Sequence, residues 1–350
     1  MSSEGTRALN VGGQTLQPGT KQVLRLPVTV GLNGGDINVW VHAVHGAKPG
    51  PTLVILSGLH GDEWFSLESI QRIIAEADPA TLSGTLLVVS FANSPALGAG
   101  ARNMPDETDS PDMNRIFPGP LKATSDQIIG VISRELLTHA THLLDFHIGP
   151  WGSTFMDILF GGDFTKPGLS DENERLALTF GTPLVRRANV TTGFPGPRSS
   201  LGYGGVVLGI PTLGVEIGGA GFGREAELVW HEHLFAGVRA FMGTIGMIEG
   251  AADIRPKRQL VYSMSHRVNP SVGGILRPLF GPESLGEPVE KGTLLGTVVS
   301  PYTLEVIEEL YAPVDGLIFY IGRDYPVNPG DWAFGIASTD PATSKWVDNA

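Results

Sequence analysis

The segment that decides the fold of this chain is Leu53-Val54-Ile55-Leu56-Ser57-Gly58-Leu59-His60-Gly61-Asp62-Glu63. It begins as an apolar run typical of a buried strand, ends in small residues, and then presents His60 and Glu63 three positions apart. A histidine nitrogen and a carboxylate oxygen together suit zinc. The segment therefore predicts a buried strand that leads directly into a metal site.

Two further apolar runs carry reactive side chains at or near their ends. Leu143-Leu144-Asp145-Phe146-His147-Ile148-Gly149 provides His147, and Gly214-Val215-Glu216-Ile217-Gly218-Gly219 provides Glu216. Two histidines and one glutamate leave a fourth zinc position open for water, which is the pattern of a catalytic site. A lone His-x-x-Glu pair is a weak signal. Three strand ends that carry such groups favour one active site, because sites in open α/β sheets form beyond the carboxyl ends of strands.

From residue 51 the chain alternates apolar strands with helices, which is typical of a sheet covered on both faces. The sequence therefore predicts an α/β fold with a mainly parallel or mixed central sheet, helices on both faces, and a small all-β C-terminal domain. The expected strands are 52–57, 85–92 and 142–148, and the expected helices are 64–77, 125–139 and 225–248. Residues 93–124 are rich in Pro, Asn and Asp and are expected to be irregular.

The predicted organisation has three parts. Residues 1–45 form a β-rich segment attached to the catalytic domain, residues 46–252 form that domain, and residues 256–340 form a β domain similar to the barrel-sandwich of biotin and lipoyl carriers. Such carriers need a lysine at a hairpin tip, and the corresponding turn, 299–305, has none. A packing or covering role is therefore expected for the last part.

Four other histidines are interpreted as residues outside the site. His42 and His45 are expected on the surface of a strand, and His231 and His233 on a helix, at the surface or hydrogen-bonded.

Composition excludes several classes of protein. The net charge of −12, without a basic run, argues against a nucleic-acid partner. The absence of cysteine excludes disulfides and thiolate ligands. The N-terminus shows no secretory signal, and no apolar run reaches the roughly 20 residues that span a bilayer, so a cytoplasmic protein without a membrane partner is expected. The oligomeric state stays open, a homo-oligomer included.

The order of the motifs resembles the succinylglutamate desuccinylase and aspartoacylase family, within the zinc carboxypeptidase-like fold. The family pattern is Gly-x-His-Gly-x-Glu, then Asn-Arg-x-Phe-Pro-Gly, then Asp-x-His, then a late Glu followed by glycines, and this chain carries all four blocks between residues 58 and 219. The resemblance implies one zinc ion per chain, held by His60, Glu63 and His147.

The resemblance also implies roles for the catalytic residues. Glu216 matches the family's late glutamate, which acts as general base, and Arg102 lies where the family carries an arginine that stabilises the oxyanion. A buried glutamate paired with an arginine and a solvated loop arginine are the respective alternatives. Asp145 lies on the same strand face as His147 and either holds that histidine or serves as a turn residue.

Three residues are candidates for substrate binding. Asn114 and Arg115 match the family's adjacent pair that binds the substrate carboxylate, for which arginine suits because its fork meets a carboxylate with two hydrogen bonds. The alternative for Arg115 is a brace within the 93–124 loop. Arg198 is a weaker candidate for a second anion contact.

The leading hypothesis is a zinc-dependent amidohydrolase that removes an acyl group from a small N-acyl amino acid. The family includes deacylases for N-succinylglutamate, N-acetylaspartate and the N-acetyldiaminobutyrate of ectoine breakdown, and the long chain with its carrier-like C-terminal part leans toward the third. One alternative is a metallocarboxypeptidase that acts on small peptides, and another is a non-catalytic binding protein on the same fold. The sequence fixes neither the acyl group nor the amino acid.

Overall fold

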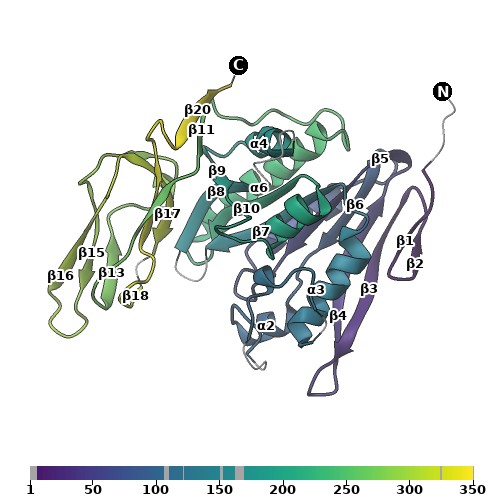
Figure 1. Ribbon diagram of the computed structural model, residues 1–350, viewed down its shortest axis with the longest axis horizontal. Helices are drawn as coiled ribbons and strands as arrows, with labels where there is room; N and C mark the ends of the chain where they lie inside the picture. The colour runs from purple at the N-terminus through teal and green to yellow at the C-terminus, as the bar shows by residue number, and fades with distance from the viewer. Residues whose placement is uncertain are drawn as a thin grey trace.

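The computed structural model describes residues 6–105, 110–120, 122–149, 153–161, 169–323 and 325–349. Within these residues the chain builds a 14-stranded mixed sheet, a four-stranded sheet and a two-stranded hairpin. Figure 1 shows the N-terminal strands at one edge of the large sheet and the four-stranded sheet at the opposite end of the molecule. The predicted α/β class with a mixed central sheet is confirmed.

The elements have the following bounds. The large sheet contains β3 (Thr20–Val30), β4 (Asp36–His45), β5 (Lys48–Ser57), β6 (Ser83–Val89), β7 (His142–Gly149), β8 (Ser153–Gly161), β9 (Leu184–Ala188), β10 (Thr212–Gly219), β11 (Arg258–Tyr262), β12 (Ser265–Val268), β14 (Pro288–Val289), β17 (Gly316–Gly322), β19 (Phe334–Ser338) and β20 (Ser344–Asp348). The hairpin is β1 (Leu9–Val11) and β2 (Gln14–Leu16), and the small sheet is β13 (Gly274–Pro278), β15 (Leu294–Val299), β16 (Val306–Tyr311) and β18 (Pro326–Val327). The helices are α1 (Leu67–Glu76), α2 (Ser94–Ala99), α3 (Thr124–Ile132), α4 (Leu169–Leu178), α5 (Ser200–Gly202) and α6 (Arg224–Thr244), with shorter turns η1 (Met113–Arg115), η2 (Ser133–Leu137), η3 (Tyr203–Leu208) and η4 (Pro282–Ser284).

The three strands that carry the candidate site are neighbours in the sheet. β7 pairs in parallel with β5 on one side and with β10 on the other. Their carboxyl ends therefore lie at the same edge, as the sequence predicts. β8, which was not predicted from the sequence, pairs antiparallel with β10. The sheet is mixed because of this pair and of the antiparallel pair of β4 and β6 at its other side.

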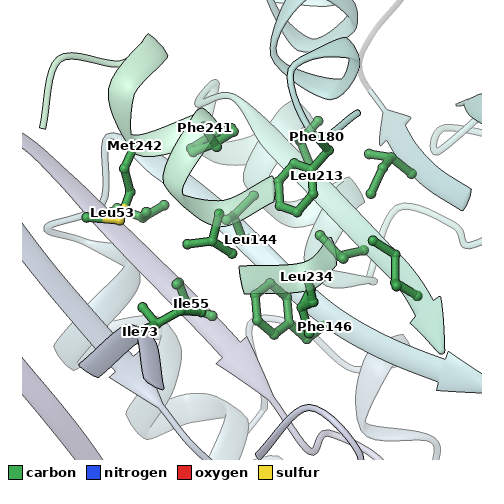
Figure 2. Packing of buried hydrophobic residues seen from close by; sticks show 14 of the residues in the cluster. Leu53, Ile55, Ile73, Leu144, Phe146, Phe180, Leu213, Leu234, Phe241 and Met242 are labelled. Atoms are coloured by element: carbon green, nitrogen blue, oxygen red, sulfur yellow. The ribbon is translucent and has the colours of Figure 1, made fainter. Parts of the chain in front are cut away.

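The core lies on both faces of this sheet because successive strand residues point to opposite sides. Leu53 and Ile55 of β5 and Leu144 and Phe146 of β7 pack against α1 and α6, and Figure 2 shows this layer, with Ile73 and Phe241 as its helical contacts. The intervening residues face the other layer, which contains the isoleucines of α3. Since Leu143 belongs to that second layer, Asp145 and His147 point to the same side.

The C-terminal strands do not form an isolated barrel. β17 pairs with β8, and β11 pairs with β9, so strands from both sides of the predicted boundary share one sheet. The segment from 249 to 257, between α6 and β11, has no helix or strand, and the domain division at this point stays a prediction. The hairpin of β15 and β16 turns at 300–305, close to the predicted turn.

The position predicted for His45 is wrong. His45 ends β4 and is only 4% exposed. Its Nδ1 lies 2.8 Å from the Thr85 hydroxyl, and its Nε2 lies 2.8 Å from the Arg7 carbonyl oxygen. Its polar atoms find partners inside the protein, so burial is tolerated. His231 and His233 are hydrogen-bonded on α6, to Ser69 and to the Phe180 carbonyl, as expected.

Among the helices that the structure describes, none is long and apolar enough to cross a membrane.

Candidate active site

Glycines shape the loop that follows β5. Gly58 adopts φ +64°, and a side chain there would meet the ring of Phe91 at 2.6 Å. Gly61 donates its N–H to the Arg102 carbonyl oxygen at 3.0 Å, and an added Cβ would lie within 2.5 Å of Ala96 and Ala101 atoms. Glycine is therefore required at both positions. The chain turns sharply out of the strand and brings His60 and Glu63 back over its end.

His60, Glu63 and His147 converge into one buried cluster. The Nδ1 atoms of His60 and His147 each lie 2.8 Å from a different oxygen of Glu63. Each residue offers one ligand atom, and these three atoms lie within 4.8 Å of one another. The three side chains are at most 7% exposed. The group can therefore hold a metal ion.

The far side of each histidine ring faces a second carboxylate. Nε2 of His60 lies 2.9 Å from Asp112 Oδ1, and Nε2 of His147 lies 2.8 Å from Asp145 Oδ2. Metal-ligating histidines usually donate their second N–H to such a carboxylate, which fixes the tautomer and the ring orientation. This geometry supports the role of Asp145 as the group that holds His147, and it adds Asp112, for which the sequence predicted no role.

The outward contacts of the two Nε2 atoms indicate that a cation fits between the two Nδ1 atoms and Glu63. If each Nε2–H donates outward, each Nδ1 presents a lone pair to a carboxylate oxygen of Glu63, and only a proton or a metal ion makes that contact favourable. Burial lowers the pKa of His147, but Asp145 and Glu63 outweigh it and raise the pKa well above its ordinary value. Burial likewise raises the pKa of Glu63, yet His60 and His147 hold it well below its usual range. The pocket therefore demands positive charge between these three groups, and their donor set fits zinc.

Glu216 lies beside this cluster in the sheet. It is in register with His147 of β7 on one side and with Asp157 of β8 on the other, so the three side chains share one face. Burial, joined by the charges of Glu63 and Asp157 and opposed by His147 and Arg186, raises the pKa of Glu216 to about 7. No hydrogen-bond partner of the Glu216 carboxylate occurs among the described residues. A carboxylate without fixed partners and with a pKa near neutrality suits proton transfer.

Two predicted residues line the same site and are held by its carboxylates. Arg102 donates from Nη1 to Glu63 at 2.8 Å and from Nη2 to Asp112 at 3.2 Å. Asn114 donates to Asp145 at 3.2 Å and accepts the N–H of Ser200 at 2.8 Å. Arg102 is thus not a free loop arginine, and Asn114 is a buried link between two loops.

The two remaining arginines differ in position. Arg115 donates to the Asn114 carbonyl oxygen at 2.6 Å, and its guanidinium lies 5.0 Å from the centre of the Phe194 ring. Arg198 donates to the carbonyl oxygens of Ile116 and Phe117, at 2.9 and 3.1 Å. Arg115 lines the cavity described next, whereas Arg198 is not among its lining residues. The contacts of Arg198 brace the loop that carries Asn114 and Arg115.

A cavity of about 330 Å³ brings the site together. Its polar wall is formed by His60, Glu63, Arg102, Asn114, Arg115, His147 and Glu216. Its apolar wall includes Phe155, Leu159, Phe194, Pro195 and Leu201. The C-terminal part of the chain contributes Arg267 and Trp332. The sequence predicted the polar wall but neither the apolar wall nor Arg267 and Trp332. These two residues reach the cavity only through the strand pairing of the C-terminal part.

A buried cluster behind Glu216 was also missed. Asp157 is 0% exposed, forms an ion pair with Arg186 at 2.5 Å, and accepts a hydrogen bond from the Tyr262 hydroxyl at 2.7 Å. Arg186 also donates to that hydroxyl at 2.9 Å. Burial raises the pKa of Asp157 despite these partners. The sequence does contain an indication of this cluster, because Asp157 is the one carboxylate inside the apolar run 154–160 and a buried charge needs a partner.

Replacing Arg186 with methionine is expected to lower the free energy of unfolding by about 3–5 kcal/mol, since Asp157 is left buried without a counter-charge. Denaturant unfolding measures this change. The exposed neighbour Arg187, changed to methionine, is the matched control and should cost far less. The double variant Asp157→Leu, Arg186→Met should recover most of the loss. A loss below about 1 kcal/mol for Arg186→Met would contradict this account of the pair.

Comparisons with known proteins identify relatives of this chain. The profile of the succinylglutamate desuccinylase/aspartoacylase catalytic domain matches residues 49–241. The chain is 26% identical over 291 residues to the N-alpha-acetyl-L-2,4-diaminobutyric acid deacetylase of Halomonas elongata, covering 81% of this chain and 80% of that protein. The fold is similar to that of the product-bound ectoine utilization protein EutE (DoeB) of Ruegeria pomeroyi, with a TM-score of 0.77, 20% identity, and coverage of 97% of this chain and 100% of that one. It is also similar to a succinylglutamate desuccinylase/aspartoacylase of Rhodobacter sphaeroides, with a TM-score of 0.76, 20% identity, and coverage of 94% and 96%.

Proposed function

Because the chain belongs to the succinylglutamate desuccinylase/aspartoacylase family, we propose that it is a zinc-dependent amidohydrolase that removes an acyl group from a small N-acyl amino acid. The observation that carries the proposal is the single cavity shared by His60, Glu63 and His147 with the adjacent Glu216. Hydrolysis of an amide needs an electrophilic centre, a base for water and an acid for the leaving amine. In this cavity His60, Glu63 and His147 would hold a metal ion that polarises the amide carbonyl, and Glu216 is the candidate for both the base and the acid.

His60, Glu63 and His147 would hold the zinc ion. A bound zinc supplies Lewis-acid chemistry, because it polarises a carbonyl oxygen and lowers the pKa of water. Asp112 and Asp145 keep both histidine rings oriented through their Nε2 atoms. The carboxylates around the two rings also favour positive charge at the centre of the site.

Glu216 is the proposed general base. Its carboxylate accepts a proton from the attacking water and then returns it to the nitrogen of the leaving amine, so one group serves both steps. Burial raises its pKa to about 7, close to the value at which both directions of transfer are effective. A divalent cation nearby would lower that pKa and keep Glu216 ionised at neutral pH.

Arg102 and Arg115 are proposed to contact the substrate on different sides. Arg102 uses one N–H each on Glu63 and Asp112, and its other N–H groups, which have no partner among the described residues, are proposed to bind the oxyanion that forms at the amide carbon. Arg115, beside Asn114, is proposed to bind the carboxylate of the amino acid. The contacts of Arg198 give no support to direct substrate binding, and we propose that it holds this loop in place.

Size favours an acyl amino acid over a longer peptide. A cavity of about 330 Å³ is at the small end of the range for ligand sites, and Arg267 and Trp332 form part of its wall. The name of the Halomonas elongata relative supports an N-acetyl substrate, and diaminobutyrate is one candidate for the amino acid.

The direct test is amine release by zinc-loaded protein from acetyl, succinyl and formyl amino acids, assayed beside unmodified dipeptides. Hydrolysis of one acyl series with little action on dipeptides is the expected result. Preference for dipeptides would make the protein a carboxypeptidase. Bound zinc with no turnover across both panels would make it a non-catalytic binding protein.

Arg115→Ala is expected to weaken kcat/KM for a substrate with a free carboxylate by about 2–4 kcal/mol, on the scale of a lost charge-assisted hydrogen bond. The amide analogue of that substrate should change little, because it offers no partner to the guanidinium fork. Kinetics with both substrates, and a melting curve, measure this selectivity.

Arg198→Ala is the matched control, because it removes an arginine from the same pair of loops without touching the cavity. Arg198→Ala should lower kcat/KM equally for the acid substrate and for its amide analogue, and it should lower the melting temperature. If Arg115→Ala behaves in the same way, Arg115 braces the loop and does not recognise the carboxylate.

A further inference from the structure

Arg267 is an arginine of the C-terminal part that reaches the active-site cavity. It lies on β12, next to β19 in the large sheet, and is exposed. Its guanidinium carbon lies 4.2 Å from the centre of the Trp332 ring. Within the described part of the chain this guanidinium has no hydrogen bond or ion pair. The cavity wall thus contains a cation that no carboxylate of the described residues pairs with.

Trp332 is a rigid support for this cation. Its indole N–H donates to the Phe334 carbonyl oxygen at 2.8 Å, and its ring stacks on Tyr320 at 4.1 Å. Phe155 of β8 packs edge-on against it at 5.5 Å. An arginine stacked on a fixed aromatic ring keeps its planar fork available and loses little conformational freedom on binding an anion.

The charges of the cavity are unevenly satisfied. Arg102 is engaged by Glu63 and Asp112, whereas Arg115 and Arg267 are hydrogen-bonded to no carboxylate in the described chain. Glu63 and Glu216 are the carboxylates among the residues that line the cavity, and Glu63 is occupied by the two histidines and Arg102. Among the described residues of the cavity wall, a cationic substrate side chain would therefore meet Arg267 and no free carboxylate except that of Glu216.

We propose that Arg267, supported by Trp332, forms an anion-binding subsite that selects substrates with a second carboxylate and rejects those with a cationic side chain. This subsite rests on the proposed amidohydrolase function. It predicts that N-acetyldiaminobutyrate, whose side chain is cationic, is not the preferred substrate. Arg115 binds the carboxylate of the amino acid, and Arg267 binds a second carboxylate. That second group belongs either to the side chain of the amino acid or to a dicarboxylic acyl group.

The test compares matched compounds on zinc-loaded protein by calorimetric binding and by kcat/KM. N-acetyl-L-glutamate against N-acetyl-L-glutamine probes the side chain, and N-succinyl-L-alanine against its terminal amide probes the acyl end. N-acetyl-L-2,4-diaminobutyrate is the cationic member. We expect the acid of one pair to bind about tenfold or more tightly than its amide, and the cationic compound to bind weakest.

Arg267→Gln should remove that preference while leaving the amides nearly unchanged. Arg258→Gln is the matched control, because Arg258 stacks on Trp346 at the same distance of 4.2 Å but lies outside the cavity. It should keep the preference. Equal binding of acids and amides to the unmodified protein, or a preference that survives Arg267→Gln, would overturn the subsite. Binding with the expected preference but without hydrolysis of any compound would support the subsite and reject the amidohydrolase instead.

Discussion

His147→Ala is expected to yield protein that holds little zinc and hydrolyses its substrate about a thousandfold more slowly, because a bound metal contributes several kcal/mol to the transition state. Two ligands remain in this variant, and they bind a zinc ion poorly. Glu63 and Asp145 also lose the ring that lies 2.8 Å from each of them. Elemental analysis of the purified protein and steady-state kinetics measure the two losses together.

His142→Ala is the matched control for that experiment. His142 begins the same strand, lies 2.9 Å from the Thr141 hydroxyl, and is not among the residues that line the cavity. Its removal should leave zinc content and turnover close to those of the unmodified protein. Full zinc occupancy in His147→Ala, with loss of zinc in His142→Ala, would exchange the roles of the two histidines.

Glu216→Gln is expected to keep the zinc and lower kcat by about a hundredfold or more, which is the usual scale for a general base. Glutamine preserves the shape of the side chain, but it cannot accept the proton of water. In the unmodified protein kcat should fall as the pH falls through the pKa of Glu216, because only the carboxylate acts as base. The residual activity of the variant should lack this dependence on Glu216. Zinc content, kcat and a pH profile are the three measurements.

Glu225→Gln provides the same chemical change at an exposed position at the start of α6. It should alter neither zinc content nor kcat. Unchanged turnover in Glu216→Gln would assign the base to another group. If zinc and turnover are lost in the same proportion, Glu216 helps to bind the ion, and its role as base is not supported.

Local pattern was sufficient to predict the strands that carry the site. The apolar runs that contain Leu53 and Leu144 are long, and each leads into a residue whose chemistry is distinctive. Because parallel neighbours place their carboxyl ends together, the convergence of His60, His147 and Glu216 on one edge followed from these runs. The spacing of two residues placed Asp145 on the same strand face as His147, but it left open whether Asp145 holds that histidine or serves as a turn residue.

Contacts between distant segments could not be predicted in this way. The pairing of β17 with β8 joins residues more than 150 positions apart, and an apolar alternation does not specify its partner strand. The sequence around Arg267 and Trp332 therefore did not indicate that these residues line the cavity. His45 was misplaced for a related reason, since its partner Thr85 lies on the adjacent strand and its other partner near the N-terminus.

The pairing of β17 with β8 also decides what the C-terminal part does for the rest of the chain. Without that part, β8 would present unpaired N–H and C=O groups along its Ser153–Phe155 end, next to the ring of Phe155. The unpaired N–H and C=O groups of such an apolar edge can form hydrogen bonds with strands of other chains. The C-terminal strands therefore act as a protective border of the sheet, and a shortened chain that ends after α6 would be prone to self-association.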